Sequence, residues 1–247
     1  MRARLVLVVV LVAVLLPLAA QAQGLPTITL GIGEADEPAQ VSTALQILIL
    51  LTILSVAPAI LLMTTAFTRI VIVLSFVRQA IGTQQAPSNQ IVVGLALFLT
   101  FFIMAPVFNQ INDEALQPYL NEEITQEEAL PLALEPMRRF MFSQVGEQDL
   151  QLLVDISQSP QPETMEDIGL LTLIPAFMLS ELKRAFQMGF LLFVPFLMID
   201  MVVASILMAM GMMMLPPIIV SLPFKILLFV LVDGWSLVIG SLVQSFG

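Results

Sequence analysis

Apolar residues in this chain form long uninterrupted stretches that are separated by shorter polar ones. One stretch covers residues 44–67, and a second covers 91–108. From residue 168 to residue 246 the chain is again mostly apolar, and two adjacent prolines divide this part into two runs. A helix that crosses a bilayer needs about 20 predominantly apolar residues. The pattern therefore predicts an all-α membrane protein with about four long hydrophobic helical segments.

The polar stretches divide the chain into two hairpins. A first hydrophobic hairpin is predicted over 41–108, and a basic loop over 68–90 joins its two helices. This loop holds two arginines and no acidic residue. Because short loops rich in Lys and Arg remain in the cytoplasm, the loop is predicted to be cytoplasmic. A second hydrophobic hairpin, which carries a methionine-rich loop, is predicted over 168–247.

The region between the hairpins, residues 109–167, is strongly acidic. It contains thirteen Asp and Glu residues, and its only basic residues are Arg138 and Arg139. Five prolines predict short helices here. A block of like charge is usually a solvated surface. Since one apolar segment separates this region from the cytoplasmic loop, we predict that it is extracytoplasmic.

The first 22 residues have the pattern of a secretory signal peptide. Arg2 and Arg4 precede an apolar run over 5–16, and the small-residue sequence AQA follows at 20–22. Secretory signal peptides have a basic N-terminal end, a short apolar run and a cleavage site of small residues. The alternative, an uncleaved membrane helix, requires a longer run. Residues 23–40 then form an extracytoplasmic N-terminal segment, and a bacterial inner membrane is the predicted location.

The composition supports a membrane protein and excludes several kinds of catalytic and metal-binding site. Of the 247 residues, 58% are hydrophobic and 11% are charged, whereas soluble domains have roughly 45–50% and 25%. The chain has no His and no Cys, so thiol nucleophiles, imidazole bases and the usual zinc ligands are missing. Ser180 with Lys183, and Ser221 with Lys225, could share helix faces, but that spacing is common. We therefore predict no enzyme, no cofactor and no metal site, and the lack of a basic patch argues against nucleic acid.

Six charged residues interrupt the apolar segments of the second hairpin. They are Glu181, Lys183, Arg184, Asp200, Lys225 and Asp233. Charges at membrane depth are rare, costly and normally paired. Three acids balance three bases, so internal ion pairs are one explanation, and a proton or ion relay in a secondary transporter is another. Such transporters often contain inverted repeats, and none is apparent here.

Five methionines gather within seven positions of the same hairpin, in the sequence MAMGMMMLPP. They are Met208, Met210, Met212, Met213 and Met214. Gly211, Pro216 and Pro217 predict a hinge or loop between two helices, because glycine permits unusual dihedral angles and proline ends a helix. Methionine side chains are flexible and re-pack easily. They suit a surface that must close and open; lipid-facing or core-filling methionines are the alternative.

Two long strings closely resemble the FliP family of flagellar type III export-gate proteins. They run from Thr68 to Asn109, beginning TRIVIVLSFVRQAIGTQQAPSNQ, and from Ser180 to Trp235, beginning SELKRAFQMGF. The resemblance implies helical hairpins assembled into an oligomeric ring. It also implies a pore-forming subunit that conducts unfolded flagellar proteins across the inner membrane, with the five methionines lining the central constriction.

The resemblance also implies the partners and the location. A homo-oligomeric, pentameric ring is expected, joined by FliR and FliQ beside FlhB and FlhA, with FliO as an assembly helper, in the membrane lipid of the flagellar basal body. The injectisome export-gate subunit is the alternative, although members of that group commonly lack a cleaved signal peptide. An ion-coupled secondary transporter is a further alternative.

Overall fold

The computed structural model describes residues 38–83, 86–157, 162, 164–212 and 214–247. The predicted signal peptide, and residues 23–37 of the segment that follows it, lie outside the described residues. The chain divides into two compact units. One ends at Thr52, and the other runs from Ile53 to Gly247. The candidate site lies in the second unit.

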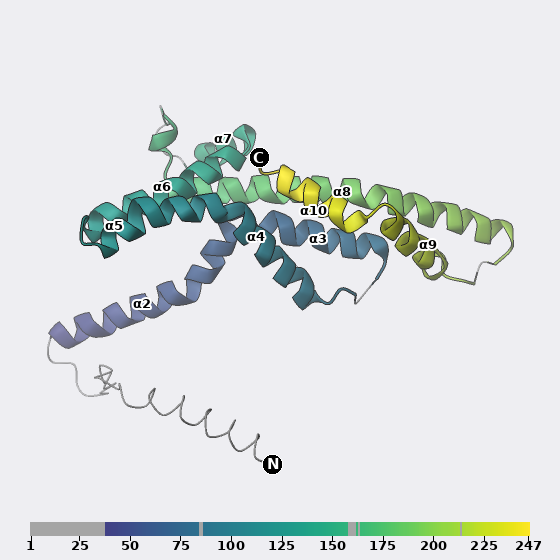
Figure 1. The fold of residues 1–247 in the computed structure, drawn as a ribbon, viewed down its shortest axis with the longest axis horizontal. Coiled ribbons are helices and arrows are strands. Elements are labelled where there is room, and N and C mark those ends of the chain that lie inside the picture. The colour runs from purple at the N-terminus through teal and green to yellow at the C-terminus, as the bar shows by residue number, and fades with distance from the viewer. Residues whose placement is uncertain (1–37, 84–85, 158–161, 163, 213) are drawn as a thin grey trace, which may run out of the picture. The chain divides into compact units, whose positions relative to one another are not determined.

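The described residues are helical and include no strand, which confirms the all-α class. In chain order the elements are α2 (Pro38–Met63), α3 (Phe67–Ile81), α4 (Asn89–Ile111), a π-helical turn η2 (Asn112–Leu116), α5 (Gln117–Leu120), α6 (Gln126–Gln144), α7 (Glu147–Ser157), a 3₁₀ turn η3 (Met165–Asp167), α8 (Leu170–Ala209), α9 (Pro217–Leu231) and α10 (Gly234–Gln244). Figure 1 labels the main ones.

The predicted number of membrane segments agrees with the structure. By length and composition, two helices could cross a membrane, Asn89–Leu120 and Leu170–Ala209. Two bent pairs raise the number to four if each pair is one span, namely Ile47–Met63 of α2 with α3, and α9 with α10. Each pair bends by 64° at a short break. The fold is therefore that of an all-α membrane protein.

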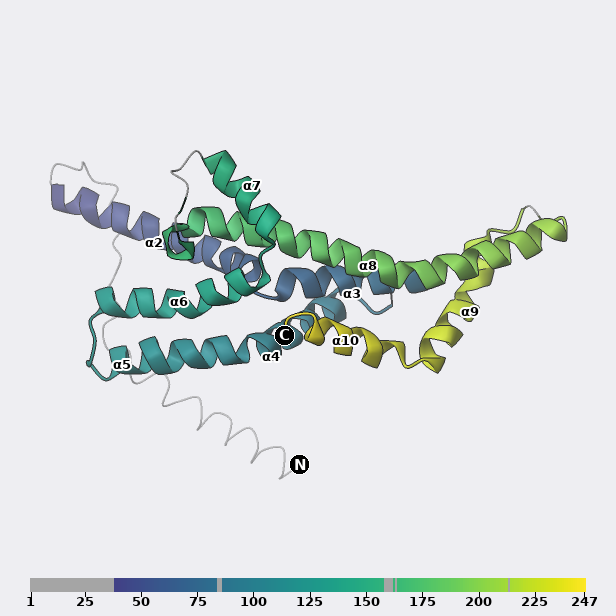
Figure 2. The ribbon, with the colours of Figure 1, turned by 90° about the horizontal axis from the view of Figure 1, so that it is seen from above.

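Helix α3 is the centre of the second unit and packs against α8 and α4. Figure 2 shows α3 lying along α8. Its buried apolar residues include Ile70, Val73, Leu74 and Val77, which recur at helical spacing and so face one side. At Gly189 of α8, a β-carbon would collide with the ring of Phe76. The glycine therefore allows the two helices to approach closely.

The structure corrects the loop that the sequence predicted over residues 68–90. Most of this stretch is helix α3, and the helix ends at Gly82, which has a φ of 87°. The two arginines and the absence of acidic residues suggested a solvated loop. The apolar positions at helical spacing outweigh them, because Arg69 is buried among partners rather than solvated. The true connection begins at Gly82 and ends at Ser88.

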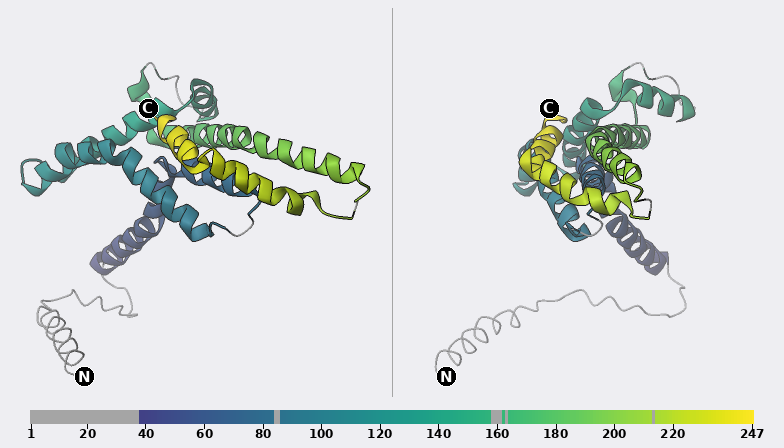
Figure 3. Two further views of the ribbon diagram at one scale, coloured as in Figure 1. Left: turned by 45° about the vertical axis from the view of Figure 1, so that its right-hand side comes forward. Right: turned by 90° about the vertical axis from the view of Figure 1, so that its right-hand side faces the viewer.

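Helix α8 is longer than the hydrophobic pattern indicated. It is a single 40-residue helix that continues through the charged residues from Glu181 to Arg184. Near its start, Leu173 and Phe177 join Met141 and Ile168 in a second, smaller core. Beyond it, α9 packs against α8 as the other arm of a hairpin, and α10 follows α9 after a bend (Figure 3). This hairpin carries the candidate site.

Candidate functional site

The methionine-rich stretch forms the turn between α8 and α9. Helix α8 ends at Ala209, and Gly211 takes the left-handed conformation with a φ of 74°. The Gly211 N–H donates to the Met208 carbonyl, and the Met212 N–H donates to the Leu207 carbonyl, both at 3.0 Å. This pair of hydrogen bonds commonly closes a helix that ends in a left-handed glycine. The glycine therefore defines where α8 stops.

Two prolines define where the returning helix begins. Pro217 is the first residue of α9, and Pro216 precedes it in an extended conformation with a φ of −67° and a ψ of 118°. Proline suits the first helical position because the N–H that it lacks would have no helical partner there. The methionines thus lie between two backbone features that each fix the chain locally.

The methionine side chains of this turn are exposed rather than packed in the core of the chain. The exposed fractions are 59% for Met208, 59% for Met210, 40% for Met212 and 98% for Met214. The predicted gate residue Met213 lies outside the described residues. Four of the five methionines are therefore free to contact something other than this chain.

An apolar groove of about 480 Å³ lies next to the turn, between the two arms of the hairpin. Met210 forms part of its wall, together with Ile206 and Leu207 of α8 and with Val220 and Phe224 of α9. The groove has almost no polar lining. The arms therefore do not close fully against each other near their tip.

A buried ion pair joins the two arms of the hairpin below the turn. The Lys225 ammonium of α9 lies 2.5 Å from a carboxylate oxygen of Asp200 on α8. Lys225 also donates to the backbone carbonyl of Ala80 at 3.3 Å, and Ser221 donates to the other oxygen of Asp200 at 2.5 Å. The Lys225 side chain is only 4% exposed. These contacts hold α8, α9 and the end of α3 together.

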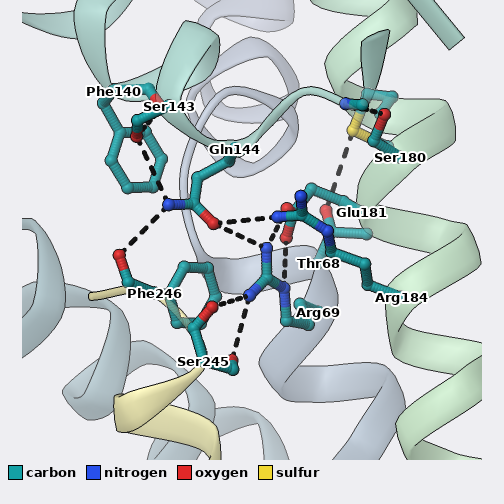
Figure 4. A network of polar contacts seen from close by, with 12 residues as sticks. Thr68, Arg69, Phe140, Ser143, Gln144, Ser180, Glu181, Arg184, Ser245 and Phe246 are labelled. Carbon is teal, nitrogen blue, oxygen red and sulfur yellow. Dashed lines mark hydrogen bonds and ion pairs between the residues drawn. The ribbon is translucent and has the colours of Figure 1, made fainter. Parts of the chain in front are cut away.

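A second buried network surrounds Arg69 at the other end of the hairpin (Figure 4). Its guanidinium forms a salt bridge with Glu181, and both side chains are fully buried. It also donates to Gln144 Oε1 at 3.0 Å, to the Ser245 carbonyl at 2.8 Å and to the Ser245 hydroxyl at 2.9 Å. The ring of Phe246 lies 3.8 Å from its central carbon. Arg69 therefore joins α3, α6, α8 and the C-terminal residues.

The remaining basic residues of α8 face the acidic region. Arg184 donates to Gln144 Oε1 at 3.1 Å, and Lys183 lies 3.6 Å from a carboxylate oxygen of Asp149. Ser180 donates to Asp149 at 2.8 Å and accepts from the Gly146 N–H at 2.9 Å. These contacts fasten the start of α7 to α8.

Asp233 differs from the other five charged residues that the sequence singled out. It lies at the break between α9 and α10, with left-handed dihedral angles of φ 51° and ψ 53°. Its side chain is exposed. Within the part of the chain that the structure describes, its carboxylate makes no hydrogen bond and no ion pair.

The structure brings together only one pair from the predicted set of six charges, Asp200 with Lys225. Sequence reasoning missed the partner of Glu181, which is Arg69 and had been assigned to the loop. One signal was available, since only Thr68 and Arg69 separate the apolar run that ends at residue 67 from the apolar residues that begin at Ile70. Among the described residues, no group of three or more acidic side chains is placed to hold a metal ion.

The helices, the buried charge pairs and the exposed methionine turn define an integral membrane protein whose hairpin presents a flexible apolar tip. A family model described as the FliP family matches residues 50–242. The chain belongs to the FliP family.

Curated relatives agree with this assignment over nearly the full length of the chain. The flagellar biosynthetic protein FliP of Bacillus subtilis is 57% identical over 217 residues, which cover 88% of this chain and 98% of that protein. The protein of the same name from Caulobacter vibrioides is 56% identical over 201 residues, covering 81% and 76%. That of Aquifex aeolicus is 50% identical over 224 residues, covering 90% and 92%.

Proposed function

We propose that this protein is a pore-forming subunit of the flagellar type III protein export gate. It acts in flagellar biosynthesis, as the names of its relatives state of those proteins. Unfolded flagellar proteins pass through the pore across the bacterial inner membrane. The turn between α8 and α9 contributes a flexible apolar gasket that closes this pore at rest.

The exposure of the methionines is the observation that carries the proposal. A core-filling role within this chain would place these side chains against other residues of the hairpin, yet Met214 is 98% exposed and Met208 and Met210 are more than half exposed. Several copies arranged around an axis would bring such turns together. The side chains would then fill a central space that no single copy can fill.

The chemistry of methionine suits a gate for threaded polypeptides. A narrow apolar constriction excludes water and therefore ions, because dewetting raises the barrier for any hydrated species. The thioether is unbranched and polarisable, so it yields to side chains of many shapes without holding any of them strongly. A gate of this type needs no catalytic group, and the transported chain meets no charged side chain of the turn.

The backbone around the turn supports a defined position for the gasket. Asp200 lies eight residues before Met208, which is about 12 Å along an α-helix. Its ion pair with Lys225 fixes the two arms relative to each other at that level. The methionine side chains can therefore change rotamer, while the ion pair keeps the backbone of the hairpin in place.

The proposal includes the arrangement in the cell. The N-terminus and the acidic region are extracytoplasmic, residues 1–22 are a signal peptide, and the connection between α3 and α4, which follows Arg78, is cytoplasmic. The protein forms a pentameric ring in the flagellar basal body with FliR and FliQ, next to FlhB and FlhA, and FliO assists assembly. These partners come from the resemblance to the export-gate family.

The test replaces all five methionines by alanine and measures ion leakage at rest. The purified assembly is placed in liposomes that contain a potassium-sensitive dye. We expect the alanine variant to leak and a matched variant with five leucines to remain closed, because leucine retains the apolar bulk. A second control replaces Met198 and Met201, which are exposed on α8 away from the turn. If the alanine variant assembles correctly and the liposomes remain impermeable to potassium, the proposed role of the methionines as a gasket is contradicted.

A further inference from the structure

Asp233 is a charged side chain without a described partner in an apolar part of the chain. The neighbouring Leu231 and Val232 are 73% and 49% exposed, and Leu237, one turn into α10, is 59% exposed. A carboxylate in such surroundings has neither water nor a countercharge once the surface is covered. Ionisable groups at membrane depth therefore pair with an opposite charge or face a polar cavity.

The basic residues of the same chain are mostly committed elsewhere. Arg69 pairs with Glu181, Lys225 pairs with Asp200, and Lys183 pairs with Asp149. Arg184 donates to Gln144. Arg138 and Arg139 belong to α6 in the acidic region. Of the described basic residues in the hydrophobic helices, this leaves Arg78.

Arg78 has a weak interaction in its own chain. It lies in the last turn of α3, and its guanidinium donates to the neutral side chain of Asn89 at 3.5 Å. No carboxylate lies within 4.0 Å of it in the described part of the chain. A guanidinium that binds only a side-chain amide at this distance retains most of its capacity for a carboxylate.

Arg78 and Asp233 lie at the same level along the hairpin. Two residues beyond Arg78, the Ala80 carbonyl accepts from Lys225 of α9. One turn before Arg78, Leu74 lines a small groove together with Trp235, which is two residues beyond Asp233. Copies related by rotation about an axis that runs along the hairpin keep the same level, so Arg78 of one copy and Asp233 of the next lie at a similar height.

We infer that Asp233 of one copy forms an ion pair with Arg78 of the adjacent copy, so that each copy contributes one charge to each of two contacts. The inference rests on the proposed ring of copies and names a contact that holds it together. The contact is head-to-tail, because it joins different surfaces of the two copies. A repeated head-to-tail contact builds a ring when the rotation between copies closes. It would also fix the angle at which each α9–α10 break meets its neighbour.

A purely local role for Asp233 makes a different prediction. Asp and Asn are the non-glycine residues that best tolerate left-handed dihedral angles. If Asp233 only served the backbone at the helix break, Asp233→Asn would be neutral. Under the ion-pair inference, Asp233→Asn loses the charge and lowers the yield of assembled ring about tenfold at matched expression, the effect of one modest charge pair.

Disulfide crosslinking tests the contact directly, because the chain has no cysteine of its own. The double variant Arg78→Cys, Asp233→Cys is oxidised in membranes and examined on a non-reducing gel. We expect a reducible ladder of dimers and higher oligomers. Two single variants expressed together, one cysteine on each chain, should stop at the dimer. Each single variant expressed alone should give no crosslink at this contact.

A separate crosslink distinguishes failure of the contact from failure of the ring. The variant Met210→Cys reports whether the turns of neighbouring copies meet. If it crosslinks while Arg78→Cys, Asp233→Cys gives only monomer or an internal disulfide, the ring stands and the inferred ion pair is refuted. If neither crosslinks, the ring itself is refuted. Charge reversal adds a functional readout: Arg78→Asp and Asp233→Arg should each abolish motility, and combining them should restore it.

Discussion

Removing the negative charge from Glu181 should destabilise the protein more than any other single charge neutralisation in the described helices. In Glu181→Gln, the guanidinium of Arg69 remains buried and hydrogen-bonded but loses its anion. Both side chains are fully buried, so water cannot replace the lost countercharge. Breaking one partner of a buried ion pair costs about 3–5 kcal/mol. The free energy of unfolding should fall by this amount.

The loss can be measured as a fall in the midpoint of thermal unfolding. For a domain of 150–250 residues, 1 kcal/mol corresponds to roughly 2–4 °C, so the expected fall is roughly 6–20 °C. The detergent-solubilised protein is heated while its helical circular dichroism is recorded. Glu135→Gln is the matched control, because it makes the same chemical change in an exposed pair with Arg138 at 3.9 Å. Such surface pairs contribute about 0–1 kcal/mol.

The double variant Arg69→Met, Glu181→Leu examines the reason for the loss. It removes both charges and fills the site with apolar side chains, which is often neutral for a buried pair. We expect it to recover part of the stability that Glu181→Gln loses, although Gln144 and the Ser245 carbonyl lose a donor. If Glu181→Gln unfolds within about 2 °C of Glu135→Gln, the buried charge is not what makes this site important.

Three further predictions concern packing and a helix start. Gly189→Ala places a methyl group against the ring of Phe76, and should lower the free energy of unfolding by about 1–3 kcal/mol in the same thermal assay. Phe177→Ala empties the smaller core and should cost about 3–5 kcal/mol, measured likewise. Hydrogen bonds from the backbone and side chain of Thr125 lower the pKa of Glu128 below its ordinary value of 4.5. Their support for α6 is therefore full above that value and is lost as the pH falls through the lowered pKa. Amide exchange across the first turn of α6 should become faster at acid pH. Glu128→Gln should abolish this pH dependence, whereas Thr125→Ala should only reduce it, because alanine retains the backbone N–H that donates to Glu128.

The number and type of the helical segments could be predicted from the sequence because hydropathy is a local property. A long apolar run that crosses a membrane favours a helix, because a helix bonds its backbone polar groups within its own segment. The runs at 44–67 and 91–108 accordingly became α2 and most of α4. Two adjacent prolines and a glycine also indicated a turn, and the structure has a turn between Ala209 and Pro217.

Helix α3 was missed because two of its residues were read as solvated charges. The spacing of Ile70, Val73 and Val77 is helical, but the pattern does not reveal whether Arg69 has a partner. The partner lies 112 residues further along the chain. An arginine that is neutralised by a distant carboxylate can lie in a core helix, whereas an unpaired one cannot, and only the folded chain distinguishes the two.

By itself the sequence determined the class of protein, the approximate number of hydrophobic helices and the position of the methionines, since each depends on residues near one another in the chain. Only the tertiary structure decided which charges are neutralised. It paired Arg69 with Glu181 and Asp200 with Lys225, and it left the carboxylate of Asp233 exposed. The physical reason is that an ion pair depends on the separation of its groups in space, and folding sets that separation for residues far apart in the sequence.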